Sequence, residues 1–281
     1  MRRHLVIIGI GYSASRVAAQ AVAQSWDVTG TKRVPDGQPN VIAYADAAEA
    51  IKNATHLLIS APPENGVDPV IRDYEKVIGA AAKLSWIGYY STTGVYGDRQ
   101  GGAVDETTPV NPTQPRAQAR VVAENGWARI ASTKNIAFDR IRIGGIYGPG
   151  RSPFEMLLSD HPRLVIAPDH AFSRIHRDDI AGGTMAAMET ASGGRVLNFV
   201  DTTPSPQHVV IEEAARIAQW PLPTPTPLDQ ALREMNPMAR SFWSERRIVR
   251  SELTCRLINR AWKFPSYREG LADIWAHRRD A

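Results

Sequence analysis

Apolar runs and amphipathic stretches alternate along the first 200 residues of the chain. Continuous apolar, β-branched runs such as residues 5–8 are typical of strands that a parallel sheet buries on both faces. We expect strands at residues 5–8, 27–31, 41–44, 56–60, 86–90, 137–143 and 195–200. We expect helices, from their helical spacing, at residues 16–24, 47–53, 67–84, 115–132 and 178–190. Repeated strand–helix units with short connections predict an α/β fold, a Rossmann-type doubly wound parallel sheet.

This rhythm stops after residue 150. Residues 151–176 are expected to be irregular, and the prolines at 221, 223, 225 and 227 enforce an extended connection. We therefore expect a Rossmann domain of residues 1–150 plus about 177–201, and a smaller C-terminal substrate lobe of residues 151–176 plus 202–281. Four tryptophans are expected to anchor the core of this lobe: Trp220, Trp243, Trp262 and Trp275.

Composition and charge exclude several classes of function. The net charge is +4, and the densest basic stretch, residues 240–260, alternates arginines with apolar residues, which predicts a solvated helix face rather than a nucleic-acid surface. Cys255 is the only cysteine, so no intrachain disulfide and no Cys-based zinc site can form, and we expect a cytoplasmic protein. No stretch approaches the roughly 20 apolar residues of a membrane helix. We expect neither a metal, nor nucleic acid, nor a membrane as partner.

A glycine pattern, G-x-G-x-x-A, follows the first expected strand and opens the first expected helix. The first glycine permits the tight turn, the second lets the backbone approach a pyrophosphate, and the alanine keeps helix and strand close. The helix N-terminus offers free N–H groups and a positive dipole end to phosphates. The alternative is a tight turn without a ligand. Because further βα units follow, we expect a dinucleotide to be bound by Gly9, Gly11, Tyr12, Ser13 and Ala14.

The end of the second expected strand indicates which dinucleotide is bound. NAD-binding proteins usually place an acid there, about 20 residues beyond the glycines, to bond the ribose 2′-hydroxyl. This chain instead has Thr31, Lys32 and Arg33. A hydroxyl beside two cations suits the 2′-phosphate of NADP, although an exposed basic turn would have the same sequence. We expect NADP to be preferred over NAD.

Three longer segments resemble the extended short-chain dehydrogenase/reductase family, which includes nucleotide-sugar epimerases and dehydratases. Residues 90–98, YSTTGVYGD, resemble the family motif that follows the fifth strand. Residues 142–151, RIGGIYGPGR, resemble its LRxxxxYGPGR segment, and residues 174–181, RIHRDDIA, resemble its HVDD(I/L)A segment. With the glycine pattern, these motifs keep the family order over residues 5–181. The tail is covered more loosely, by YREGL at residues 267–271.

The resemblance implies roles for individual residues. Thr92 stands at the place of the catalytic Ser/Thr that hydrogen-bonds the substrate oxygen. Asp46 would approach the adenine. The nicotinamide-side ribose would be lined by Ala61, Pro62 and Pro63. A polar or anionic substrate group would be faced by Arg151, Arg174 and His176, and Tyr147 is expected either to line the substrate cleft or to pack at the lobe junction. Homodimerisation through the helices that flank the sheet is a possibility that rests on the family alone.

One departure from the family is large. Its catalytic Tyr-x-x-x-Lys lies on the helix after the fifth strand, with a glutamate four residues beyond the lysine. Counting back from Glu124 places Arg116 at the tyrosine position and Arg120 at the lysine position. The chain therefore resembles atypical members of the family that lack the tyrosine. An arginine cannot exchange a proton at neutral pH because its pKa stays above about 12.

Three interpretations of this departure remain open. Tyr96, Tyr147 or His176 handles the proton, or Arg116 stabilises an anion electrostatically, or the chain binds cofactor without turnover. If Glu124 is a false anchor, the two arginines are surface charges. The first hypothesis is an NADP-dependent oxidoreductase or epimerase/dehydratase-like enzyme acting on a polar small molecule. The alternative is a catalytically silent NADP-binding sensor.

Overall fold

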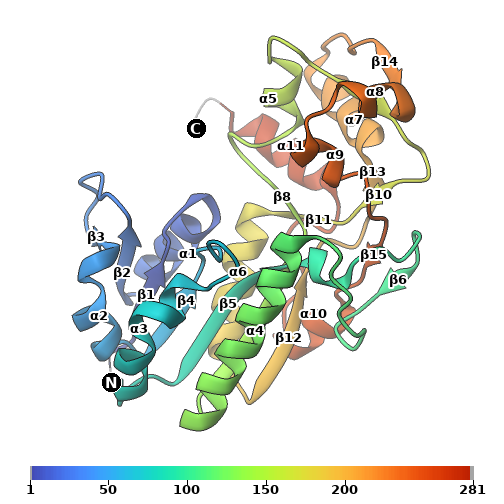
Figure 1. Cartoon of the computed structure of the whole chain (residues 1–281). Coiled ribbons are helices and arrows are strands. Elements are labelled where there is room, and N and C mark those ends of the chain that lie inside the picture. Colours follow the sequence, from blue (N-terminus) through green and yellow to red (C-terminus); the bar gives the residue numbers. More distant parts are fainter. Residues whose placement is uncertain (1, 279–281) are drawn as a thin grey trace.

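The computed structural model describes residues 2–278, and its centre is a seven-stranded sheet (Figure 1). All neighbouring strands in the sheet are parallel. The strands are β1 (His4–Ile8), β2 (Asp27–Lys32), β3 (Val41–Ala43), β4 (His56–Ile59), β5 (Trp86–Thr92), β7 (Ala137–Ile143) and β12 (Gly194–Phe199). Their order is β3-β2-β1-β4-β5-β7-β12, so the chain reverses its winding direction between β1 and β4. The Rossmann-type doubly wound sheet expected from the sequence is confirmed.

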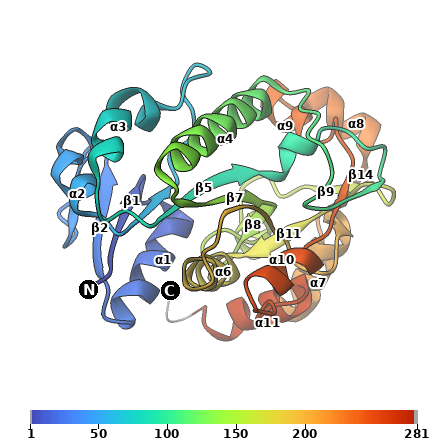
Figure 2. The ribbon, with the colours of Figure 1, turned by 90° about the horizontal axis from the view of Figure 1, so that it is seen from below.

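Helices cover both faces of the sheet (Figure 2). One face carries α1 (Tyr12–Ala23), α6 (Arg177–Glu189) and α10 (Glu252–Leu257), and the other carries α2 (Ala48–Asn53), α3 (Pro69–Ala80) and α4 (Pro115–Lys134). This layering explains the apolar strand sequences, because side chains on both faces of β1 are fully buried from Leu5 to Ile8. In an open sheet of this kind, ligands bind at the carboxyl ends of the strands, where the winding reverses.

The remaining elements of residues 2–278 are mostly short and lie mainly after β7. They are two 3₁₀ turns, η1 (Tyr44–Asp46) and η2 (Thr93–Tyr96); eight strands, β6 (Ala103–Val104), β8 (Gly145–Tyr147), β9 (Leu164–Ile166), β10 (Ala171–Phe172), β11 (Arg174–His176), β13 (Ser205–Pro206), β14 (Pro225–Pro227) and β15 (Ile248–Val249); and five helices, α5 (Pro153–Leu157), α7 (Gln207–Ala218), α8 (Leu228–Glu234), α9 (Pro237–Ser241) and α11 (Tyr267–Ala276).

Residues 151–176 are irregular only in part, which corrects the expectation from the sequence. They form α5, β9, β10 and β11, and each of these strands pairs with a strand distant in sequence. Long-range pairing of three-residue strands leaves no periodic pattern for sequence analysis to detect. The proline-rich connection is extended as expected, and its residues 225–227 pair with β9 as β14.

A second group of helices lies beyond one end of the sheet, with its own small core (Figure 1). We call α5, β9, α7, β14, α8, α9 and α11 the C-terminal lobe. Trp220 and Trp275 pack on Phe154 in its core, as expected. Trp262 instead packs against Phe199 of the sheet, and Trp243 lines a pocket described below. These last two tryptophans therefore correct the expectation.

The basic stretch at residues 240–260 is not one helix face, which is a third correction. It runs from the end of α9 through β15 into α10. Arg240 donates to the backbone carbonyls of Leu232 and Met235, and Arg247 donates to that of Gly97. These arginines close helix ends and loops, so their spacing does not follow a helical period. Among residues 2–278, no helix has the length and apolar character to span a membrane.

Candidate functional site

The glycine turn joins β1 to α1 at the point where the sheet reverses. Gly9 has φ +89°, and a side chain there would place its Cβ 2.8 Å from the backbone nitrogen of Ala61. The residue must therefore be glycine, since both the conformation and the space exclude a side chain. A Cβ on Gly11 would meet no atom within 4 Å. Nothing in the protein's own packing requires glycine at residue 11.

The N-terminus of α1 is open to an anion. Gly11 occupies the N-cap position, no side chain caps the helix, and its first turn contains no acidic residue. The free N–H groups at residues 11–14 and the helix dipole therefore favour a phosphate. This opening and the empty space beside Gly11 fit the pyrophosphate of a dinucleotide. Ser13 and Ala14 are buried beneath the turn, while the hydroxyl of Tyr12 donates to the carbonyl of Pro149 at 2.9 Å.

The residues expected to select NADP lie at the end of β2, with different roles. Thr31 is 1% exposed and its hydroxyl accepts a hydrogen bond from the backbone N–H of Gly9, at 3.1 Å. It therefore holds the turn in place and does not face a phosphate, which corrects our expectation. Lys32 pairs with Asp36, and Arg33 pairs with Glu64 at 2.9 Å with 84% of its side chain exposed.

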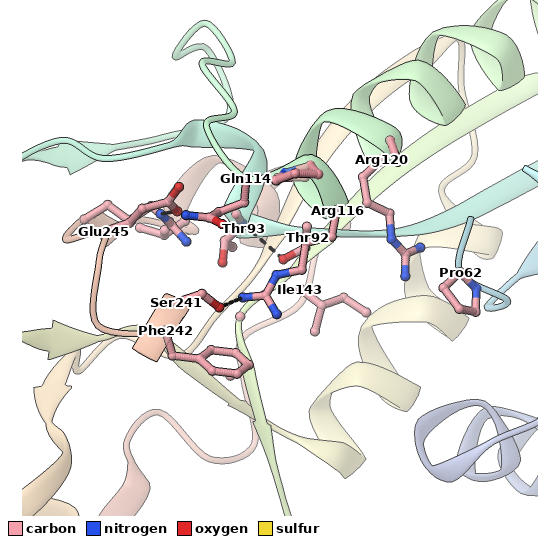
Figure 3. A pocket seen from close by; sticks show the side chains of 18 of the residues that line it. Pro62, Thr92, Thr93, Gln114, Arg116, Arg120, Ile143, Ser241, Phe242 and Glu245 are labelled. Atoms are coloured by element: carbon pink, nitrogen blue, oxygen red, sulfur yellow. Dashed lines mark hydrogen bonds and ion pairs between the residues drawn. The ribbon is translucent and has the colours of Figure 1, made fainter. Parts of the chain in front are cut away.

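A pocket of about 810 Å³ lies beyond the carboxyl ends of β4 and β5 (Figure 3). Five of the predicted site residues line it, namely Pro62, Pro63, Thr92, Arg116 and Arg120. Ala61 precedes them at the end of β4, and Asp46 is exposed in η1, outside this pocket. The pocket thus brings together residues from β4, β5 and α4 that the sequence separates by up to 58 positions (Arg120 against Pro62).

Two of the three arginines that line the pocket, Arg116 and Arg120, lie on the first two turns of α4, and the third, Arg247, pairs with Glu245. The guanidinium of Arg116 donates to the hydroxyl of Ser241 at 3.0 Å and lies 4.6 Å from the ring centroid of Phe242. Arg120 donates to the Tyr89 hydroxyl at 3.2 Å and points toward Pro62 (Figure 3). Within residues 2–278, neither arginine forms an ion pair. Their charge is therefore available to an anionic ligand.

A buried ion pair fixes α4 against the sheet directly beneath the pocket. Glu124 and Arg142 are 2% and 5% exposed, and their carboxylate and guanidinium meet at 2.8 Å. The hydroxyl of Ser91 donates to the same carboxylate at 2.6 Å. Ser91 immediately precedes Thr92, so this network sets the position of Thr92 relative to the arginines on α4.

Two candidates for proton transfer lie elsewhere, which corrects the sequence-based interpretation. Tyr96 is fully buried under the guanidinium of Arg142, and its hydroxyl donates to Asn198 at 2.8 Å. His176 is 1% exposed, caps α6 through Nδ1 and packs on Phe264 at 4.2 Å between ring centroids. Burial lowers the pKa of His176 to about 4, so it is neutral at physiological pH. Neither residue lines the pocket.

A second pocket, of about 750 Å³, opens between β8, β11 and the C-terminal lobe. Tyr147, Arg151 and Arg174, the expected substrate-binding residues, all line it. The hydroxyl of Tyr147 donates to the carbonyl of Ser266 at 3.3 Å, and burial raises the pKa of this phenol. Tyr147 is therefore no candidate for proton exchange near neutral pH.

Several lining residues were missed by the sequence analysis. Ser241, Phe242 and Glu245 reach the first pocket from α9 and the loop after it, about 125 residues beyond Arg116. Glu245 pairs with Arg247 and also accepts a hydrogen bond from Thr113. The only available signal was the aromatic pair Phe242–Trp243 inside a basic segment.

Known proteins similar to this chain fall into two groups. No protein-family model matches it. A functionally unknown conserved protein from Silicibacter pomeroyi DSS is 38% identical, covers 98% of both chains and superposes with a TM-score of 0.91. Protein YeeZ of Escherichia coli (strain K12) is 25% identical over 238 residues, which span 76% of this chain and 84% of YeeZ.

The second group consists of solved structures with low sequence identity to this chain, and they show only that the fold is shared. The dTDP-glucose 4,6-dehydratase of Bacillus anthracis str. Ames, solved in complex with NAD, is 13% identical, covers 99% of this chain and 97% of its own, and has a TM-score of 0.80. The described part of this chain therefore has the same Rossmann-type fold as this NAD-bound dehydratase.

Proposed function

We propose that this chain, which belongs to the same protein family as the functionally unknown Silicibacter pomeroyi protein, is an enzyme. It would be an NADP-preferring oxidoreductase or an epimerase/dehydratase-like enzyme that acts on a polar small molecule. One observation carries this proposal. An uncapped helix N-terminus beside a required glycine lies on the same sheet edge as a pocket with two unpaired arginines. The first feature suits a dinucleotide and the second suits an anionic substrate or transition state.

The cofactor would be held by the chain's own backbone and cations. The glycine turn and the N-terminus of α1 would bind its pyrophosphate, and Pro62 and Pro63 would line the path toward Thr92. Lys32 and Arg33 would bind the 2′-phosphate, because the exposed ion pairs they make with Asp36 and Glu64 are weak and a dianion can replace them.

Because the described part of the site lacks a tyrosine–lysine pair, other groups must hold the substrate and exchange its proton. When bound, a nicotinamide cofactor donates or accepts a hydride. The hydroxyl of Thr92 would hydrogen-bond the substrate oxygen, and the guanidinium of Arg116 would stabilise negative charge on that oxygen. The lining of the first pocket, within the described part of the chain, includes no Tyr, His, Lys or Cys, and its carboxylate, Glu245, is paired with Arg247. We therefore assign proton exchange to water that enters the pocket.

The same lining favours a second candidate function, a cofactor-binding sensor without turnover. The first test is a pair of parallel titrations of the protein with NADPH and with NADH, in which nicotinamide fluorescence reports binding. We expect NADPH to bind at least about tenfold more tightly, because a charge-assisted bond to the 2′-phosphate contributes about 1.5–3 kcal/mol. Binding of neither nucleotide at millimolar concentration would refute both functions.

Turnover then separates the enzyme from the sensor. With carbonyl substrates, Arg116→Gln should lower kcat about 100- to 1000-fold, because it removes one electrostatic stabiliser, and should leave NADPH affinity unchanged. Arg129→Gln is the matched control, since Arg129 is an exposed arginine on the same helix that pairs with Glu75 outside the pocket. Equal effects of the two substitutions would exclude the catalytic role of Arg116.

A further inference from the structure

The two pockets adjoin each other. Both are lined by Gly145, Phe172 and Phe242. One ligand can therefore place a reacting carbon near Thr92 while the rest of it occupies the second pocket. The chemistry of the second pocket then indicates what the rest of the substrate is.

The wall of the second pocket is apolar and partly exposed. Met156, Met235, Met238 and Trp243 line it from α5, the turn before α9, α9 itself and the loop that follows. Met238 is 70% exposed and Phe242 is 57% exposed. Large apolar side chains exposed together around a concave site indicate that an apolar ligand covers them. Methionine and aromatic side chains adapt readily to such a ligand.

Several polar side chains of this pocket are already engaged within the protein. Ser152 and Glu155 bond each other in the capping box of α5, and Glu155 also accepts from the N–H of Gly150. Asn236 caps α9 through its side-chain oxygen. The pocket therefore offers few acceptors for hydroxyl protons. A polyhydroxylated sugar would leave its hydroxyl groups without partners, at a cost for each one that is buried.

The cations of the second pocket are available to an anion. Arg174 donates to the carbonyls of Phe172 and Ser205 through one nitrogen only, and no carboxylate of the described residues lies within ion-pair distance of it. The acid whose charge acts on Arg174 is Asp201, and burial raises the pKa of its carboxyl to about 7, so it balances Arg174 only in part. Arg163 is exposed at the pocket wall.

We propose that the substrate is an amphipathic acid, with an apolar body against Met238, Phe242 and Trp243 and an anionic oxygen group at Arg174 and Arg163. This inference rests on the proposed function, which places the reacting end of the same molecule in the first pocket. It differs from the sugar nucleotide named for the solved dehydratase, because few acceptors for hydroxyl groups remain in the lining, among them the side chains of Gln207 and His161.

The test is equilibrium binding to the whole chain without nicotinamide nucleotide. The probe is 8-anilinonaphthalene-1-sulfonate, an apolar aromatic anion that fluoresces in apolar sites, and its displacement by butanoate, octanoate, glucose 1-phosphate and UDP-glucose is measured. Each methylene that enters the pocket tightens binding about fourfold, so octanoate should bind at least about 50-fold more tightly than butanoate. The two sugar phosphates should not displace the probe. Displacement by UDP-glucose, or no dependence on chain length, would overturn the proposal.

Matched variants locate the binding. Met238→Glu should weaken octanoate binding at least about tenfold, because it places a carboxylate beside the buried chain. Leu158→Glu is the control, since Leu158 is 69% exposed in the same lobe but does not line the pocket. Arg163→Gln should also weaken octanoate, whereas Arg233→Gln, an exposed arginine outside the pocket, should not. Equal losses within either pair would overturn the assignment. Because NADPH is absent, failure of cofactor binding and failure of this proposal are measured separately.

Discussion

The ion pair between Glu124 and Arg142 allows the sharpest prediction about this fold. Replacing Glu124 by Gln keeps the size of the side chain and an acceptor for Ser91, but it removes the only carboxylate that pairs with this guanidinium in the described chain. Both residues are at most 5% exposed, so water cannot replace the lost partner. An uncompensated buried charge destabilises a protein by about 3–5 kcal/mol. That is a large part of a typical free energy of unfolding of about 5–15 kcal/mol.

The assay is urea unfolding, followed by tryptophan fluorescence and by circular dichroism. Glu124→Gln should lower the free energy of unfolding by about 3–5 kcal/mol. The exposed Asp229–Arg233 pair is the control, and Asp229→Asn should change stability by less than about 0.5 kcal/mol. A double variant, Glu124→Leu with Arg142→Met, should recover most of the loss, because it leaves no unpaired charge. A loss below about 1 kcal/mol for Glu124→Gln would refute the reasoning.

Three further predictions concern the glycine turn and a buried histidine. Gly9→Ala should destabilise the fold by at least about 2 kcal/mol in thermal melts, because φ is +89° and the new Cβ would lie 2.8 Å from Ala61. Gly11→Ala should cost less than about 1 kcal/mol of stability yet weaken NADPH binding at least about tenfold, since only the cofactor needs that space. Burial lowers the pKa of His176 to about 4 in the folded chain, whereas a histidine in the unfolded chain has a pKa of about 6.5. As the pH falls from 6.5 to 4, the unfolded chain binds this proton before the folded chain does, so the free energy of unfolding decreases. His176→Gln should remove up to about 3 kcal/mol of that loss in urea unfolding measured across this pH range, and an unchanged pH profile would contradict it.

The sequence was informative wherever a local pattern repeats a known period. The buried strand at residues 5–8, the glycine turn and the helix of α4 were all predictable, because apolar spacing and turn chemistry act over a few residues. Glu124 as the anchor of α4 placed Arg116 and Arg120 one turn apart, and the structure puts both in the pocket with Thr92. The arginines are therefore not mere surface charges outside the site.

The roles of Thr31, Tyr96 and His176 could not be read from the sequence. Each is a reactive residue type near a motif, yet each is buried and hydrogen-bonded within the protein: Thr31 to Gly9, Tyr96 to Asn198, and His176 through Nδ1 to the N-terminus of α6. Burial depends on which distant segments pack around a residue, and no local pattern records that. The same limit applies to β9, whose partner β14 lies about 60 residues away.

By itself, the sequence determined the strands of the Rossmann sheet and the position of the glycine turn, because these follow from local periodicity and from the backbone freedom of glycine. Only the tertiary structure decided which cations stay unpaired, and that α9 brings Ser241 and Phe242 over the pocket of Arg116. The physical reason is that charge pairing and pocket shape arise from contacts between segments more than 100 residues apart. Such contacts are set by the packing of the whole chain.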